Sequence, residues 1–141
     1  MIILVIHRNI LVDESGDRYV GKLSDFGLAR RVNFHGGSLS KGGVGPLKYM
    51  APESLQPPHS FSYRSDSYMF GMTIWETLTE NRPFPSIPPL EAAKRILEGE
   101  RVEIPSSLSD RYKKLITACL NPDPMKRPSM SSILGELLQD N

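Results

Sequence analysis

Short apolar runs and turn residues fill the first part of the chain, whereas helical periodicity dominates the second part. The apolar residues 9–12 predict a short buried strand. Turn residues at 14–17 and a second strand at 19–23 would complete a hairpin, because Gly accepts positive φ and Asp bonds nearby backbone. A two-stranded hairpin is only marginally stable alone, so we expect it to rest on a larger body.

Helical patterns follow after a glycine- and serine-rich stretch at 31–45, which predicts a long surface loop. Residues 66–79 are apolar on nearly every side, which is typical of a helix in the middle of a domain. Three amphipathic helices are predicted at 90–97, from Ser109 or Asp110 to 120, and from Ser129 to 138. Their apolar faces would present Leu90, Ala93, Ile96 and Leu97, then Tyr112, Leu115, Ile116, Cys119 and Leu120, and then Ile133, Leu134, Leu137 and Leu138. The pattern as a whole predicts an α+β fold, mainly an α-helical bundle with a short β-hairpin.

Composition narrows the class of protein but says nothing about chemistry. The 141 residues fit one domain, and 39% hydrophobic with 23% charged residues exclude a disordered tail and a membrane protein. The longest apolar run, residues 1–6, is too short for a bilayer span and lacks the flanks of a secretory signal. A formal charge of +1 gives no footprint for nucleic acid or an anionic membrane. We therefore expect a cytoplasmic location, with no membrane segment and no nucleic-acid partner. A single cysteine, Cys119, excludes a disulfide framework and is expected in the core.

Candidate chemistry begins directly after the second predicted strand, at Asp25-Phe26-Gly27. A carboxylate at a strand end suits Mg²⁺, which prefers one or two carboxylates with phosphate oxygens and water. Together with His7-Arg8 before the hairpin and Ala51-Pro52-Glu53 after the loop, this order of motifs resembles the protein kinase family. Later landmarks of the family have counterparts at residues 65–76, 82–84 and 121–129, so the resemblance covers nearly the whole chain.

The resemblance implies a protein-kinase-like C-terminal lobe that uses ATP and Mg²⁺. It implies that Asp25 and Asn9 bind the metal ion and the cofactor. Asp66 would hold the catalytic loop in shape through hydrogen bonds with its backbone. Glu53 and Arg127 would form a buried ion pair that ties the activation segment to the helical bundle.

The resemblance also implies a surface on which a protein substrate would rest, formed by Pro46, Leu47, Lys48 and Tyr49. Pro at position 46 favours a tyrosine-kinase-like branch, whereas Tyr at position 49 is more typical of serine/threonine kinases. Ser38 and Ser40 are candidate phosphorylation sites in the loop that kinases often order by phosphorylation. A solvated serine-rich loop is the alternative interpretation for these two residues.

The catalytic loop departs from the family pattern. The pattern H-R-D-L-x-x-x-N has six residues between His and Asn, whereas only Arg8 separates His7 from Asn9. Alternatively, Arg8 is the residue just before the metal-binding Asn, or Asn9 occupies the Asp position. Each alignment lacks the Asp that accepts the substrate proton, so no catalytic residue is intact and His7 and Arg8 form a remnant. We expect the shortened loop to distort, or to withdraw Asn9 from metal-binding geometry.

No glycine-rich strand-turn-strand and no V-A-I-K-type lysine is found, so residues 1–141 are interpreted as a partial kinase domain without its N-lobe. One hypothesis is an inactive fragment, or an incomplete gene model, of a kinase that phosphorylates Ser, Thr or Tyr of proteins. The other is a pseudokinase remnant that acts as a signalling interaction module. Chance motif matches in an unrelated helical domain are a third interpretation. On the first two hypotheses Mg-ATP binding is weak or absent, and apolar surface is left exposed.

Overall fold

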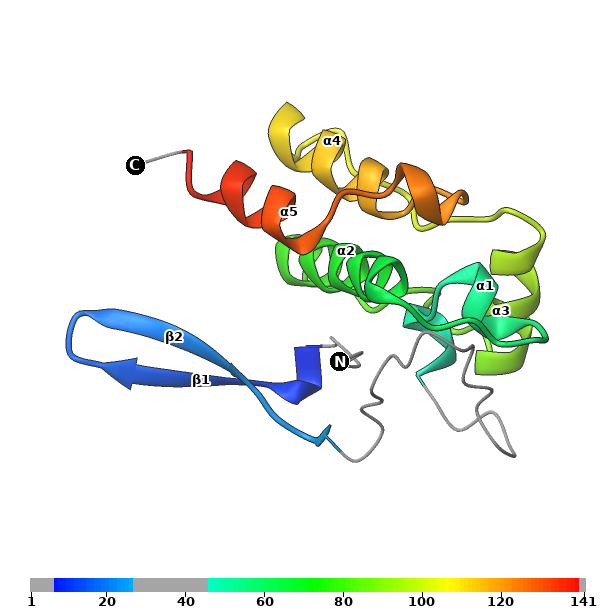
Figure 1. Ribbon diagram of the computed structural model, residues 1–141, viewed down its shortest axis with the longest axis horizontal. Helices are drawn as coiled ribbons and strands as arrows, with labels where there is room; N and C mark the ends of the chain where they lie inside the picture. Colours follow the sequence, from blue (N-terminus) through cyan, green and yellow to red (C-terminus); the bar gives the residue numbers. More distant parts are fainter. Residues whose placement is uncertain (1–6, 27–45, 140–141) are drawn as a thin grey trace.

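The computed structural model describes residues 7–26 and 46–139 as a helical lobe with a projecting β-hairpin (Figure 1). This arrangement confirms the predicted mainly helical bundle with a short hairpin. The predicted loop at 31–45, with Ser38 and Ser40, lies outside the described residues. The elements are η1 (His7–Asn9), β1 (Ile10–Ser15), β2 (Arg18–Leu23), η3 (Leu47–Tyr49), α1 (Pro52–Leu55), α2 (Tyr63–Thr79), α3 (Pro89–Leu97), α4 (Asp110–Cys119), η4 (Pro124–Lys126) and α5 (Met130–Leu137).

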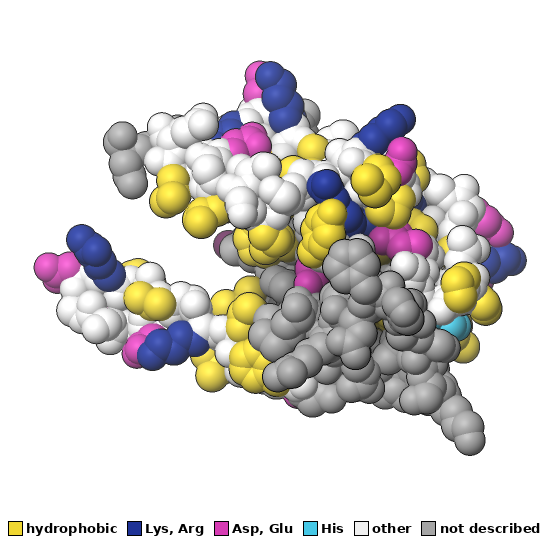
Figure 2. Space-filling model, in the orientation of Figure 1, with side chains coloured by type: hydrophobic (Ala, Val, Ile, Leu, Met, Phe, Trp, Pro, Cys, Tyr) yellow, Lys and Arg dark blue, Asp and Glu magenta, His cyan; other side chains and the backbone are white. Residues whose placement is uncertain are grey.

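The hairpin forms where the sequence predicts it, but its strands are not buried. β1 and β2 pair antiparallel from Ile10↔Leu23 to Ser15↔Arg18, and Gly16 supplies the positive φ of +62° that the two-residue turn needs. The prediction of a buried strand is wrong, since the side chain of Val12 is 69% exposed. Apolar β-branched residues favour a strand wherever they lie, but their burial depends on a partner. Here the hairpin extends away from the helices (Figure 1), and Figure 2 shows hydrophobic side chains at its surface.

Helix α2 runs through the middle of the lobe, as the apolar pattern predicts, and begins three residues earlier than expected. Ser62 caps it, because the Ser62 hydroxyl accepts a hydrogen bond from the backbone N–H of Arg64 at 3.1 Å. The backbone N–H of Ser62 in turn donates to the Ser65 hydroxyl at 2.9 Å, which completes a capping box. Buried side chains lie on all sides of the helix and include Tyr68, Met69, Met72 and Trp75.

Helix α4 packs closely on α2, and its predicted apolar face is confirmed. Leu115, Ile116 and Cys119 are buried on this face. Gly71 makes the close approach possible, because a Cβ atom at this position would lie 2.5 Å from the Cβ of Cys119. Burial, and to a lesser extent the charge of Glu136, raises the pKa of the Cys119 thiol to about 12, so this side chain stays protonated in the core.

The apolar faces predicted for α3 and α5 are only partly buried. On α3, Ala92 and Ile96 face the core while Leu90 and Leu97 are exposed, which corrects the predicted face. Ala92 and Ile96 belong to the main hydrophobic core cluster, so the helix turns this side inward and leaves the two leucines in solvent. On α5, capped by Ser129 as predicted, Ile133 is buried, whereas Leu134 and Leu138 are exposed because no described element covers them.

Candidate functional site

Backbone hydrogen bonds at the base of the hairpin bring the two predicted metal-binding positions to the same end of the sheet. The backbone carbonyl of Asn9 accepts hydrogen bonds from the backbone N–H of Ser24 at 2.7 Å and from its hydroxyl at 3.1 Å. Asn9 directly precedes β1, and Asp25 directly follows Ser24. The hairpin therefore joins the two segments that the sequence motifs place at one site.

The environments of these two residues differ. Asn9 is only 6% exposed, whereas Asp25 is exposed with a backbone φ of +57°. A left-handed backbone at a residue other than Gly is uncommon, although Asp tolerates it better than most, and such residues cluster at functional sites. The described part of the chain holds no cluster of three or more His, Cys, Asp or Glu suited to a metal ion. Binding of Mg²⁺ by Asn9 and Asp25 stays a prediction.

The catalytic-loop remnant packs against the central helix. η1 contacts α2, and Asp66 lies buried in the first turn of α2. Asp66 thus lies on the helix that η1 contacts, and its role in holding the catalytic loop stays a prediction. Arg8 is exposed, and β1 begins at Ile10, so the short loop offers no carboxylate between Arg8 and the sheet.

Residues 46–49, the predicted substrate platform, are half-buried and anchored to the lobe by two side chains. The Lys48 ammonium group donates to the backbone carbonyl of Phe84 at 2.8 Å. The Tyr49 hydroxyl donates to the two carboxylate oxygens of Glu76 at 3.0 and 3.1 Å. Burial, followed by the hydrogen bond and negative charge of Glu76, raises the pKa of Tyr49, so this phenol remains a donor at neutral pH.

Sequence analysis missed Glu76 as the anchor of this platform. The available signal is a second acidic residue, after Asp66, in a helix that is otherwise apolar on nearly every side. Such a residue inside a domain needs a hydrogen-bonding partner, because burying an unpaired charge is costly.

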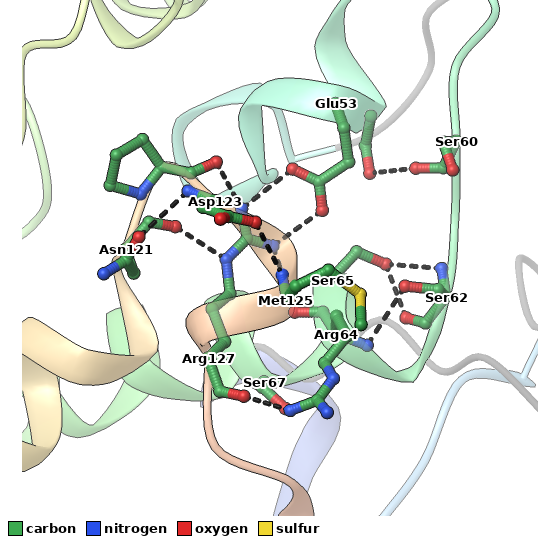
Figure 3. Close-up of polar contacts among 12 residues, drawn as sticks. Glu53, Ser60, Ser62, Arg64, Ser65, Ser67, Asn121, Asp123, Met125 and Arg127 are labelled. Atoms are coloured by element: carbon green, nitrogen blue, oxygen red, sulfur yellow. Dashed lines mark hydrogen bonds and ion pairs between the residues drawn. The ribbon is translucent and has the colours of Figure 1, made fainter.

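The ion pair between Glu53 and Arg127 is present and joins α1 to the segment before α5 (Figure 3). The guanidinium donates to the two carboxylate oxygens of Glu53 at 2.6 and 2.8 Å, and the Arg127 side chain is fully buried. It also donates to the backbone carbonyls of Asn121 at 2.8 Å and Arg64 at 3.1 Å. A buried charge with this many partners fixes the relative positions of three chain segments.

Two neighbours of this ion pair were not anticipated from the sequence. The Arg127 guanidinium lies 5.0 Å from the ring centroid of Tyr68, a distance suited to a cation–π interaction. The guanidinium of Arg64 donates back to the backbone carbonyl of Arg127 (Figure 3). Burial raises the pKa of Tyr68, and the positive charges of Arg101 and Arg127 offset only part of that rise. The arginine pair thus connects the start of α2 to the start of α5.

No helix among the described residues combines the length and the apolar character that a membrane span requires.

Known proteins with similar sequences point to one family. The family profile described as protein tyrosine and serine/threonine kinase matches residues 5–137. A mitogen-activated protein kinase kinase kinase 1a from Physcomitrium patens is 37% identical over 136 residues, which cover 93% of this chain and 17% of the relative. The tyrosine-protein kinase transforming protein ros of UR2 avian sarcoma virus is 38% identical, over 92% of this chain and 33% of the viral protein.

A third relative, vascular endothelial growth factor receptor 3 from Danio rerio, is 36% identical over 95% of this chain and 10% of its own length. The chain therefore spans between a tenth and a third of the relatives named here. Because the matching family profile covers both tyrosine and serine/threonine kinases, the predicted tyrosine-kinase-like branch stays a prediction. The match across residues 5–137, in agreement with the motifs and the helical lobe, shows that the chain belongs to the protein kinase family.

Proposed function

We propose that this chain is the helical lobe of a protein kinase domain and that it does not transfer phosphate by itself. In this proposal the complete family member transfers the γ-phosphoryl group of ATP to Ser, Thr or Tyr of a protein substrate, in the cytoplasm. Phosphoryl transfer depends on positioning and on electrostatic stabilisation, with a carboxylate that accepts the proton of the substrate hydroxyl. The lobe supplies the platform and its supports but no such carboxylate.

The proposal rests on one observation, which is how few residues separate Arg8 from β1. Only Asn9 separates Arg8 from Ile10, the first residue of the strand. An amide cannot accept a proton as a carboxylate does, so Asn9 is no substitute for the missing Asp. Asp66 does not replace it either, because its side chain is buried in α2.

Binding of Mg-ATP is expected to be weak for a related reason. Of the two ligands that the motifs imply, Asp25 exposes its carboxylate and Asn9 is buried. Mg²⁺ keeps most of its water and relies on one or two carboxylates with the phosphates of the nucleotide. When bound, the ion would neutralise phosphate charge, but one exposed carboxylate gives it little hold on this chain.

Isothermal titration calorimetry of the whole chain with ATP, with and without Mg²⁺, tests this proposal. We expect no magnesium-dependent heat in the micromolar range and no phosphate transfer to a generic protein substrate. An Asp25→Asn variant serves as the matched control, because it should give the same trace as the unaltered chain. Micromolar, magnesium-dependent binding that Asp25→Asn abolishes would refute the proposal. Transcript sequence across the codons for Arg8 and Asn9 would show whether five codons are missing there.

A second candidate function is a non-catalytic interaction module in signalling. The preserved scaffold favours it, since the buried ion pair of Glu53 and Arg127 and the core around α2 are complete without any catalytic residue. Such a module should unfold cooperatively as an isolated chain. A molten state that binds hydrophobic dyes and lacks a cooperative transition would count against this function.

A further inference from the structure

The substrate platform carries a lysine without an opposite charge. Lys48 lies half-buried in η3, and among the described residues its ammonium group makes one hydrogen bond, to the backbone carbonyl of Phe84 at 2.8 Å. An ammonium group has three donors, so two of them are left for another acceptor. A charge that is partly removed from water is compensated less by one neutral carbonyl than by a carboxylate. The platform therefore offers a positive charge that a bound anion would neutralise.

Two acidic residues on the helices that η3 contacts have partners other than Lys48. η3 contacts α2 and α3. On α2, the Glu76 carboxylate accepts the hydrogen bonds of the Tyr49 hydroxyl. On α3, Glu91 forms an ion pair with Arg95 at 3.2 Å. Within residues 7–26 and 46–139, no carboxylate pairs with Lys48, so the lobe leaves this charge for a ligand.

A second positive charge lies close to this lysine. Phe84, whose carbonyl holds the ammonium group, is two residues from Arg82 along the chain, so their Cα atoms are at most about 7 Å apart. Arg82 is exposed and forms no ion pair with any other described residue. The positive charges of Arg8 and Arg82 also reach the Tyr49 hydroxyl, where both oppose the rise of its pKa. The platform is therefore bordered by cations.

The segment that connects α2 to α3 has a strained backbone where it holds Lys48. Glu80, Phe84 and Ser86 have positive φ values of +56°, +49° and +61°, and none of them is Gly. Phe84 is bulky, buried and followed by Pro85, so this conformation is costly for it. Such conformations persist only where the surrounding structure fixes them, and they cluster at functional sites. The strain therefore supports a positioning role of the Phe84 carbonyl for the ammonium group.

We propose that Lys48 and Arg82 bind an anionic side chain of a protein substrate, an inference that rests on the proposed function because residues 46–49 would receive the substrate there. Lys48 donates to the anion from a fixed position, since the Phe84 carbonyl holds its ammonium group. Arg82 donates from the exposed edge, and its planar guanidinium suits the two oxygens of a carboxylate or a phosphate group. The substrate class is thus a protein with aspartate, glutamate or a phosphorylated residue in the bound stretch.

Fluorescence anisotropy of the whole chain with short labelled peptides provides the test. The peptides share one neutral sequence and differ only in the residues on either side of a central tyrosine, which are glutamate, glutamine or phosphoserine. Glutamine matches glutamate in shape but has no charge. We expect the glutamate peptide to bind about tenfold more tightly than the glutamine peptide, because it adds a charged hydrogen-bonding partner. The tighter of the two anionic peptides shows whether carboxylate or phosphate is the preferred group.

Variants at the two cations assign the effect, with a matched control. Lys48→Met keeps an apolar stem but removes the charge, so the preference for anionic peptides should disappear, whereas Lys48→Arg should retain most of it. Arg82→Gln should reduce the preference. Lys114→Met removes the charge of an exposed lysine on α4 and should leave the preference unchanged. Circular dichroism verifies the helical lobe in each variant.

Equal binding of the glutamate and glutamine peptides, or no binding of any peptide, would overturn the anion site. A preference that Lys48→Met retains, or that Lys114→Met also loses, would overturn it as well. The measurement needs no nucleotide, so its outcome is separable from that of the proposed function. Magnesium-dependent ATP binding in calorimetry contradicts the proposed function alone, whereas the absence of a preference for anionic peptides contradicts the anion site alone.

Discussion

The helical lobe and the hairpin contain the same kinds of interaction in opposite environments. In the lobe, Glu53 and Arg127 form an ion pair with a fully buried guanidinium, whereas Asp13 and Lys22 pair in the hairpin with both side chains about half exposed. The apolar side chains differ likewise, because Met72 is fully buried and Val12 is largely exposed. In the lobe the ion pair and the apolar side chains are buried together, whereas in the hairpin both are exposed to solvent.

The residues of the candidate functional site are divided between the lobe and the hairpin. The platform and its anchors, Tyr49 and Glu76, belong to the lobe, whereas Asp25 lies at the end of the hairpin. The residues that hold the fold are therefore separable from the residues that would hold a nucleotide. Retention of the first group supports kinship and a stable scaffold, but it gives no support to catalysis.

The largest effect should come from breaking the buried ion pair with Glu53→Gln. The substitution keeps the shape of the side chain but leaves the Arg127 guanidinium buried without an opposite charge. We expect the free energy of unfolding to fall by about 3–5 kcal/mol, measured by chemical denaturation followed by circular dichroism.

The same substitution at Glu91 is the control for this prediction. Glu91 pairs with Arg95 on the exposed face of α3, at 3.2 Å, and its loss should change stability by less than about 0.5 kcal/mol. Equal effects of the two substitutions would show that the pair of Glu53 and Arg127 is open to solvent, contrary to the structure.

A direct comparison of the two regions uses one truncation in each. Met72→Ala removes a fully buried side chain next to α4 and should cost about 2–5 kcal/mol of stability. Val12→Ala removes an exposed one and should cost less than about 0.5 kcal/mol. Urea denaturation of the two variants measures both values. A large loss for Val12→Ala would mean that the hairpin packs against another surface in solution.

The sequence was sufficient where local signals and periodicity agree, and insufficient where burial depends on a partner. The apolar surroundings of α2, the face of α4, the turn at Gly16 and the cap at Ser129 were all predictable from local chemistry. The buried face of α3 was not, because its pattern allows two orientations and only packing against the rest of the lobe chooses between them. Burial of the strands was not predictable either, since strand propensity does not specify what covers a sheet.

The candidate site likewise contains residues that the sequence predicts and residues that it does not. Motif order located Asp25, Asp66 and the pair of Glu53 and Arg127, because these residues stand at fixed positions relative to the elements. The anchors of the platform and the cation–π contact of Arg127 with Tyr68 depend on how helices cross, which no local pattern records. The roles of Asn9, Asp25 and Asp66 stay predictions that binding experiments must decide.

Two glycines in helices test how tightly the lobe itself is packed. Gly71→Ala introduces a Cβ atom 2.5 Å from that of Cys119 and should destabilise the chain by about 1–3 kcal/mol through overpacking. Gly135→Ala in α5 meets nothing within 4 Å and should stabilise it by about 0.5–1 kcal/mol, since Ala is the better helix former. Thermal denaturation shows whether each variant is less or more stable than the unaltered chain. A neutral Gly71→Ala would show that α2 and α4 can move apart without loss.

The smallest effect should come from Asp13→Asn, which removes the ion pair of the hairpin. Both side chains are about half exposed, so the pair contributes less than about 0.5 kcal/mol, and 1 M salt should abolish even that through screening. Global unfolding is too insensitive for an effect this small, so amide hydrogen exchange of β1 and β2 is the appropriate measurement. The exchange rates of the strands should rise slightly at low salt while those of α2 stay unchanged. If the hairpin and the lobe unfold independently, amide exchange should be slower in α2 than in the hairpin. The exchange rates of α2 should then not respond to Asp13→Asn. A parallel change in both regions would show that the hairpin and the lobe unfold as one unit.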